Sequence, residues 1–148
     1  MWGSQKNMLY ENRPQQLLVT ATPGVGSITY HAPPSVKEEH SINWLFDNLG
    51  GEIQFLAEEN ISGQKNPDLL WNDGLLDIKH TSGNLDTLGK RIQEALRQSS
   101  RNGALIDITS AKFTDQEAID IALSRIARVG GNYVILIRDG QLVAYISE

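Results

Sequence analysis

Three charged residues with regular spacing, Asp68, Asp77 and Lys79, carry the chemical signal of the sequence. Residues two apart in a strand point to the same face, so Asp77 and Lys79 are expected to be neighbours. Asp73-Gly74, between the strand-like runs at 69–71 and 75–80, is a typical hairpin signal. If these two residues form the turn, Asp68 pairs with Lys79 and lies diagonal to Asp77. A three-residue turn would move Asp68 to the opposite face.

Two carboxylates at this separation suit a hard divalent cation whose remaining ligands are water molecules. Asp68 and Asp77 are therefore the predicted metal ligands, with Mg²⁺ expected and Mn²⁺ or Zn²⁺ as alternatives. Such an ion lowers the pKa of water and neutralises charge on a phosphate under attack. Lys79 can orient or deprotonate that water, or stabilise the phosphate. His80 points to the other face of a regular strand and is expected to have a minor role.

The ordinary alternative for these charges is a solvated ion pair worth well under ~1 kcal/mol. The strand at 75–79 has apolar residues on both of its faces, however, so the charges interrupt an otherwise buried strand. Strands covered on both faces rarely carry charge without a use. We therefore favour a functional cluster.

A fourth acidic group is expected from the first helix, which begins after Ser35. Ser35 and Glu38 form a capping-box pattern, and an apolar face follows over 42–49. Glu38 lies about 30° and Glu39 about 70° from the centre of that face. Either carboxylate can point toward the sheet, and Glu38 is equally well explained as the capping acid.

The elements that position these residues follow from hydrophobic periodicity and turn signals. Helices are predicted at 35–49, 85–99 and 115–129, and strands at 53–56, 69–71, 75–80, 104–109, 133–138 and 141–146. The last two strands form a hairpin around Asp139-Gly140. The order α-β-β-β-α-β-α-β-β predicts an α/β domain with a mixed central sheet flanked by helices.

Residues 1–34 differ from the rest, with four of the five prolines and only short strand-like runs at 16–21 and 27–30. We interpret them as an extension or leader, forming a loose hairpin or the tail of a larger polypeptide. Residues 35–148 are then the folded domain.

Composition excludes several classes of protein. The 148 residues include no cysteine, which excludes a disulfide scaffold, a thiolate metal site and a cysteine nucleophile. No apolar run reaches the ~20 residues of a membrane span, and no signal peptide is recognised. The formal charge of −5 argues against coating nucleic acid through bulk positive charge.

Asn66-Pro67-Asp68, eight intervening residues, and Asp77-Ile78-Lys79 resemble the signature of the PD-(D/E)XK nuclease superfamily. The α-β-β-β-α-β core of this restriction-endonuclease-like fold matches the order predicted from 35 to 109. The predicted C-terminal helix and β-hairpin follow that core.

A closer resemblance covers most of residues 38–146 and is to C-terminal toxin domains of bacterial contact-dependent growth inhibition proteins. It rests on the segments 49–53, 65–68, 73–74, 77–79, 95–98 and 103–108. It implies a nuclease, commonly a tRNase, that acts in the cytoplasm of a bacterial target cell and is inhibited by a cognate immunity protein. It also implies that Asp68 and Asp77 bind metal, that Lys79 is the catalytic lysine, and that Glu38 or Glu39 is the helix acid. Asp77 stands where glutamate is common in this family.

Lys65, Arg91 and Gln98 are the predicted contacts to nucleic acid. Lys65 is a loop residue close to Asp68, and Arg91 and Gln98 flank the inner face of the second helix. The alternative for Arg91, Gln98 and Asp107 is packing or a surface role.

The sequence thus predicts a metal-dependent endonuclease toxin that hydrolyses RNA, above all tRNA. One alternative is a metal-independent RNase of the barnase-like and colicin-like group. In it, Lys79, His80 and Thr81 would perform acid–base chemistry on the ribose 2′-hydroxyl, but strand alternation separates Lys79 from His80. The second alternative is a non-catalytic binding module with a degenerate nuclease fold, which the acidic charge fits better.

Overall fold

The computed structural model describes residues 22–57 and 68–147. Its elements are β1 (Gly26–Tyr30), α2 (Val36–Asn48), β2 (Gly51–Phe55), β3 (Leu69–Trp71), β4 (Gly74–His80), α3 (Leu85–Gln98), β5 (Gly103–Asp107), α4 (Asp115–Val129), β6 (Tyr133–Arg138) and β7 (Gln141–Ile146). The seven strands form one mixed sheet in the order β1-β2-β3-β4-β5-β6-β7. The α/β class and the predicted order of elements after residue 35 are confirmed.

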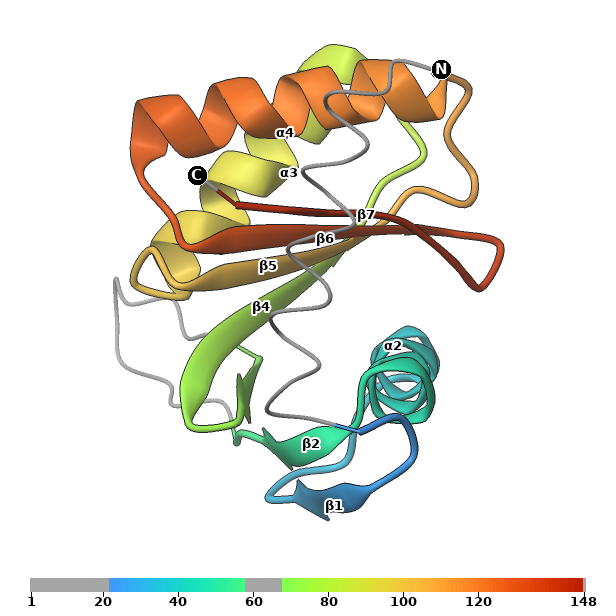
Figure 1. The fold of residues 1–148 in the computed structure, drawn as a ribbon, viewed down its shortest axis with the longest axis vertical. Helices are drawn as coiled ribbons and strands as arrows, with labels where there is room; N and C mark the ends of the chain where they lie inside the picture. Colours follow the sequence, from blue (N-terminus) through green and yellow to red (C-terminus); the bar gives the residue numbers. More distant parts are fainter. Residues whose placement is uncertain (1–21, 58–67, 148) are drawn as a thin grey trace.

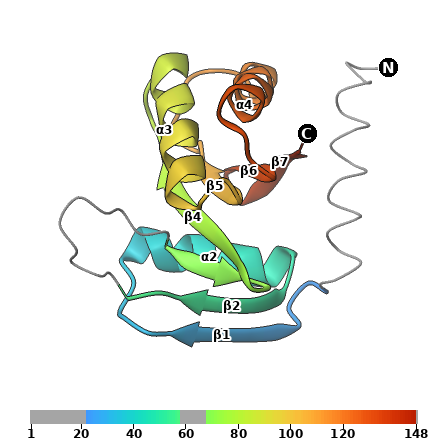
Figure 2. The same cartoon turned by 90° about the vertical axis from the view of Figure 1, so that its left-hand side faces the viewer.

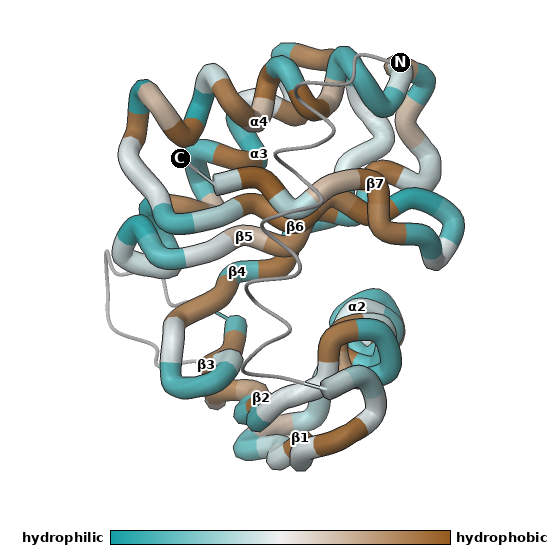
Figure 3. The backbone as a smooth tube through the Cα atoms, viewed as in Figure 1, coloured by the Kyte–Doolittle hydropathy of each residue, from teal (hydrophilic) through white to brown (hydrophobic). Residues whose placement is uncertain are grey.

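Helices cover both faces of the sheet. Figure 1 shows α3 and α4 on one side of β5–β7 and α2 on the other. Each side has its own core of buried apolar residues, one built around α3 and α4 and one around α2. Hydrophobic residues lie along β5 and β6, which run between these two helical layers (Figure 3). The sheet twists strongly, so β4 crosses the direction of β1 and β2 (Figure 2).

The helices begin where the sequence predicts. The Ser35 side chain accepts a hydrogen bond from the amide of Glu38, whose carboxylate accepts one from the amide of Ser35. Thr114 and Glu117 form the same capping box at the start of α4. These caps satisfy amide groups that the first helical turn leaves without partners. None of the helices in the described part of the chain combines the length and apolar character that crossing a membrane requires.

The hairpin between β3 and β4 differs from the predicted one. Trp71 pairs with Gly74, so the turn consists of Asn72 and Asp73. Both have positive φ, 48° and 68°, as a type I′ turn requires, and Asn and Asp tolerate this conformation. Gly74 instead opens β4, where a Cβ would lie 2.6 Å from Nδ2 of Asn102. The predicted turn at Asp73-Gly74 is therefore wrong, although its two-residue length is right.

The strand-like run near residue 28 belongs to the sheet. β1 pairs in parallel with β2, from Gly26 opposite Gly51 to Tyr30 opposite Phe55. The predicted leader, residues 1–34, thus includes an edge strand of the sheet. The other run in that segment, 16–21, lies outside the described residues, and its place in a loose hairpin stays a prediction.

Gly103 at the start of β5 has no room for a side chain. An added Cβ would lie 2.1 Å from Cζ of Tyr133, whose buried ring stacks on Tyr145 at 5.3 Å. We expect Gly103→Ala to lower the free energy of unfolding by at least about 1–3 kcal/mol, because the packed ring of Tyr133 has to move. Denaturant unfolding measures the loss. Gly140→Ala is the control: it has positive φ but meets no described atom within 4 Å, and should cost only about 1 kcal/mol.

Candidate active site

Asp68 and Asp77 lie opposite each other on the hairpin. Leu69 pairs with Leu76, so continuing the register by one residue places Asp68 across from Asp77 rather than across from Lys79. Oδ2 of Asp68 accepts a hydrogen bond from the amide of Ile78 at 2.7 Å, which holds its carboxylate against β4. The predicted pairing partner of Asp68 is therefore wrong. The shift is two residues, however, and an even shift leaves all three charged side chains on one face.

The site is strongly desolvated. Asp77 is only 1% exposed, and Asp68 is partly buried. Burial raises the pKa of Asp77 to about 8, and the negative charge of Asp68 adds to this effect while Lys79 opposes it. Burial also raises the pKa of Asp68, although its hydrogen bonds to Ile78 and Asp77 act in the other direction. The two carboxyl groups therefore resist carrying two negative charges at once.

Lys79 supplies the nearby positive charge. Its Nζ lies 3.3 Å from Oδ2 of Asp77, and its side chain is 22% exposed. Within the described residues, that buried oxygen nevertheless receives no well-aligned hydrogen bond. Lys79 thus acts as a counter-charge rather than as a full hydrogen-bond partner. A buried carboxylate oxygen without a well-aligned donor is unusual, and such an oxygen can serve as a ligand for a cation.

The acid from the first helix is best matched by Glu38. Its charge contributes to the raised pKa of Asp68 and opposes the lowering of the pKa of His80 by burial, so Glu38 lies within electrostatic reach of the cluster. One of its oxygens also caps α2, as expected for the capping acid. Glu39 is exposed, and its charge acts instead on Tyr30, whose pKa it helps burial to raise. A catalytic role stays a prediction for either glutamate.

The donor set fits a cation held by few protein ligands. Residues 22–57 and 68–147 contain no group of three or more His, Cys, Asp or Glu side chains placed to hold an ion. Mg²⁺ commonly uses one or two carboxylates and takes its other ligands from water and substrate phosphates. Asp68 and Asp77, with the orphaned oxygen of Asp77, meet that requirement. A structural zinc site, which needs four protein ligands, does not fit.

Of the three predicted nucleic-acid contacts, the structure describes Arg91 and Gln98, and neither is among the groups that act on Asp68 or Asp77. Arg91 is exposed and pairs with Glu94 on its own helix at 3.3 Å. Gln98 is half-buried in the last turn of α3. Lys65 lies outside the described residues. Trp71 is buried and donates a hydrogen bond to the carbonyl of Gly50, so it is a packing residue of the sheet.

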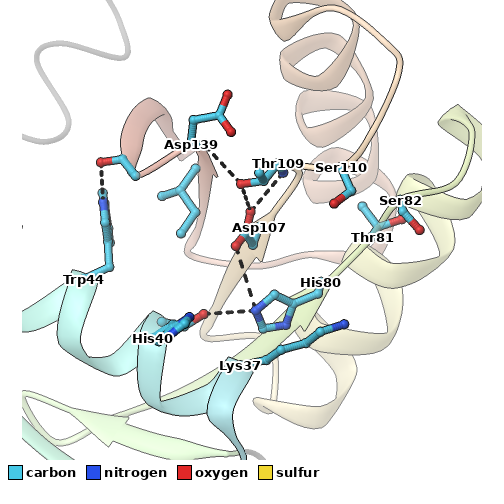
Figure 4. A pocket seen from close by; sticks show the side chains of 13 residues that line it. Lys37, His40, Trp44, His80, Thr81, Ser82, Asp107, Thr109, Ser110 and Asp139 are labelled. Atoms are coloured by element: carbon cyan, nitrogen blue, oxygen red, sulfur yellow. Dashed lines mark hydrogen bonds and ion pairs between the residues drawn. The ribbon is translucent and has the colours of Figure 1, made fainter.

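A second polar site lies across β4 from Lys79. A cavity of about 520 Å³ is lined by α2, by the carboxyl ends of β4 and β5, and by the β6–β7 turn. Figure 4 shows His80 at its floor, between Asp107 and α2. Nε2 of His80 lies 3.3 Å from the Ser41 hydroxyl and 3.9 Å from Oδ2 of Asp107. Burial lowers the pKa of His80, which favours the neutral imidazole, although Asp107 opposes the shift.

Sequence reasoning missed this cavity. His80 was expected to have a minor role and Asp107 a packing or surface role, whereas both line it. Their meeting depends on the parallel register that sets His80 opposite Asp107. A usable signal was the group of polar residues at the ends of two predicted strands, at 80–82 and at Asp107, Thr109 and Ser110. Ligands often bind at the carboxyl ends of parallel strands in such sheets.

The fold is similar to that of a chain in the CdiA-CT/CdiI toxin and immunity complex from Burkholderia pseudomallei. The two chains are 18% identical, with a TM-score of 0.61, and the match covers 83% of this chain and 98% of that chain. At this identity the likeness is one of fold. No protein-family model matches the chain, and no curated protein matches it.

Proposed function

We propose that this protein is a metal-dependent endoribonuclease of restriction-endonuclease-like architecture, and that it acts as a toxin module. The observation that carries the proposal is the buried Oδ2 of Asp77, which lies beside Asp68 and Lys79 and receives no well-aligned hydrogen bond from residues 22–57 or 68–147. The likeness in fold to a toxin–immunity complex supports the biological setting. By that analogy, the partner is a cognate immunity protein. The proposed substrate, tRNA, and the proposed site of action, the bacterial cytoplasm, rest on the resemblance of the sequence to contact-dependent growth inhibition toxins.

In this proposal Asp68 and Asp77 hold the divalent ion, with Mg²⁺ as the expected ion. When bound, the ion lowers the pKa of water at the site and offsets charge on the phosphate. A divalent ion held there would favour the charged form of Asp77, because its positive charge would offset the burial penalty on the carboxylate. Lys79, whose ammonium lies beside Asp77 and is partly exposed, would stabilise the negative charge that develops on the phosphate. Glu38 is the acid from the first helix and acts on the cluster through its charge, which contributes to the raised pKa of Asp68.

Cleavage of total bacterial RNA with Mg²⁺ and with EDTA tests this function. We expect discrete tRNA fragments that require the metal. Lys79→Ala should slow cleavage about 100-fold or more, because a positioned ammonium of this kind contributes to that extent. Lys90→Ala removes an equal charge from an exposed position on α3 and should have no effect.

Two other outcomes would contradict the proposal. Cleavage that survives EDTA would favour the metal-independent RNase, although that mechanism uses Lys79 and His80 together and the two side chains lie on opposite faces of β4. Absence of cleavage of both RNA and DNA, with normal growth of cells expressing the protein, would favour the non-catalytic binding module.

A further inference from the structure

The cavity beside His80 has a charge balance that disfavours a phosphate. Among the charged residues that line it, Asp107 and Asp139 are carboxylates, and Lys37 is the ammonium. The two imidazoles, His40 and His80, add no fixed charge when neutral. A phosphate dianion would therefore meet net negative charge. A neutral group with several hydroxyls would not, and the serine and threonine hydroxyls around the cavity suit such a group.

Asp107 is held so that one oxygen faces this space. Its Oδ1 accepts hydrogen bonds from the amide of Thr109 at 2.9 Å and from the Thr109 hydroxyl at 2.5 Å. The Thr109 hydroxyl in turn accepts one from the amide of Asp139 at 2.9 Å. Oδ2 of Asp107 lies 3.9 Å from Nε2 of His80, and this distance is too long for a hydrogen bond. The chain thus presents a fixed carboxylate oxygen with capacity to accept from a ligand hydroxyl.

Two pairs of consecutive residues connect this cavity to the carboxylate cluster. Lys79 pairs with Asp77 on one face of β4, and His80 lines the cavity on the other. On α2, Lys37 lines the cavity, while the charge of Glu38 acts on Asp68. His80 also responds electrostatically to Glu38 and Asp68. The two sites lie on opposite faces of β4, and His80 at the carboxyl end of that strand is within electrostatic reach of Asp68. A polynucleotide therefore has to pass around that end of β4 to place a phosphate at the cluster and a neighbouring sugar in the cavity.

We propose that the cavity binds a ribose of the RNA strand next to the cleaved phosphate, and that Asp107 selects RNA over DNA by accepting a hydrogen bond from the 2′-hydroxyl. This inference rests on the proposed nuclease function and adds the residue that determines its preference for RNA. The 2′-hydroxyl is the group by which a protein distinguishes the two nucleic acids at a given position. A carboxylate acceptor suits it, as in dinucleotide sites where an acid binds the ribose hydroxyl.

The test uses Asp107→Asn and a matched control, Asp139→Asn. Asparagine at 107 keeps an oxygen for Thr109 but removes the charged acceptor, so the loop is expected to stay folded. Asp139 lines the same cavity from an exposed turn with φ 51°, which asparagine adopts readily. Both variants lose one negative charge. The substrates are an RNA oligonucleotide that the wild type cleaves, the same strand with single 2′-deoxy substitutions around the cut, and the all-DNA strand.

In the wild type, we expect one deoxy position beside the cut to lower kcat/KM about 10-fold or more, as loss of a hydrogen bond to a charged acceptor does. In Asp107→Asn this penalty should disappear, while in Asp139→Asn it should persist. An equal penalty in wild type and Asp107→Asn would overturn the inference and leave the nuclease in place. So would equal cleavage of RNA and DNA by the wild type.

If the wild type cleaves neither nucleic acid, the proposed function fails, and the cavity is tested by binding alone. Fluorescence anisotropy then compares labelled RNA and DNA oligonucleotides of one sequence. An RNA preference that Asp107→Asn removes and Asp139→Asn retains would support the ribose site, and equal affinities would overturn it. A deoxy substitution that blocks cleavage in every variant, with EDTA present, would instead identify the 2′-hydroxyl as the nucleophile and overturn the assignment of Asp107.

Discussion

Asp77→Asn is expected to abolish RNA cleavage without unfolding the protein. Asparagine has nearly the same shape as aspartate but cannot supply the charge that holds a hard cation. We expect the cleavage rate to fall at least about 1000-fold, which corresponds to about 4 kcal/mol of transition-state stabilisation. Single-turnover cleavage of tRNA at fixed Mg²⁺ measures the loss.

The same substitution is expected to preserve or increase stability. Asp77 is 1% exposed, and burial raises its pKa to about 8, so its charged form is disfavoured in the folded protein. An uncharged amide avoids that cost. Denaturant unfolding at pH 8 without metal should therefore give Asp77→Asn a free energy of unfolding at least equal to that of the wild type. Loss of activity together with retained stability is typical of a residue kept for function rather than for folding.

Asp73→Asn is the matched control for this prediction. Asp73 lies in the exposed β3–β4 turn with φ 68°, a conformation that asparagine adopts as readily as aspartate. This variant should keep full activity and stability. If Asp77→Asn retained more than about a tenth of the activity, Asp77 would not be a metal ligand. A large loss of stability would mean that the charged carboxylate is structural.

The hairpin of β3 and β4 shows why the cluster of Asp68, Asp77 and Lys79 could be predicted although the register of the two strands could not. Alternation along a strand depends only on parity, so an error of two residues in the turn left Asp68, Asp77 and Lys79 on one face. The turn itself was decided by Asn72 and Asp73, which tolerate positive φ, and by Asn102, which fills the space beside Gly74. Asn102 is distant in the sequence, and no local pattern reports its contact.

The cavity illustrates the other limit. Lys37, His80 and Asp107 come from α2, β4 and β5, and they meet only because the sheet sets β4 beside β5 and packs α2 across their ends. Taken alone, each of these residues is explained equally well as a polar side chain near the end of a helix or strand. Periodicity locates a helix or a strand and its buried face. It does not say which strand ends adjoin, and that adjacency creates the second site.

The pH dependence is expected to separate folding from activity. For stability, a folded pKa of about 8 lies above the ordinary value of 3.8, so between these values the folded state holds a proton that the unfolded state has lost. Stability without metal therefore falls as pH rises through this window, by at most about 1.4 kcal/mol per pH unit for this proton. The raised pKa of Asp68 acts with the same sign. Asp77→Asn should show a shallower decline in denaturant unfolding between pH 5 and pH 8.

Cleavage should change in the opposite direction over the same window. The cation binds the charged carboxylate, so it competes with the proton on Asp77. At limiting Mg²⁺, the rate should rise with pH toward about 8, following the pKa of Asp77. At saturating Mg²⁺, the midpoint should move to lower pH, because the ion displaces the proton more easily. A midpoint that does not respond to the Mg²⁺ concentration would separate the titrating group from the metal site. The burial that destabilises the charged carboxylate would then have no part in catalysis.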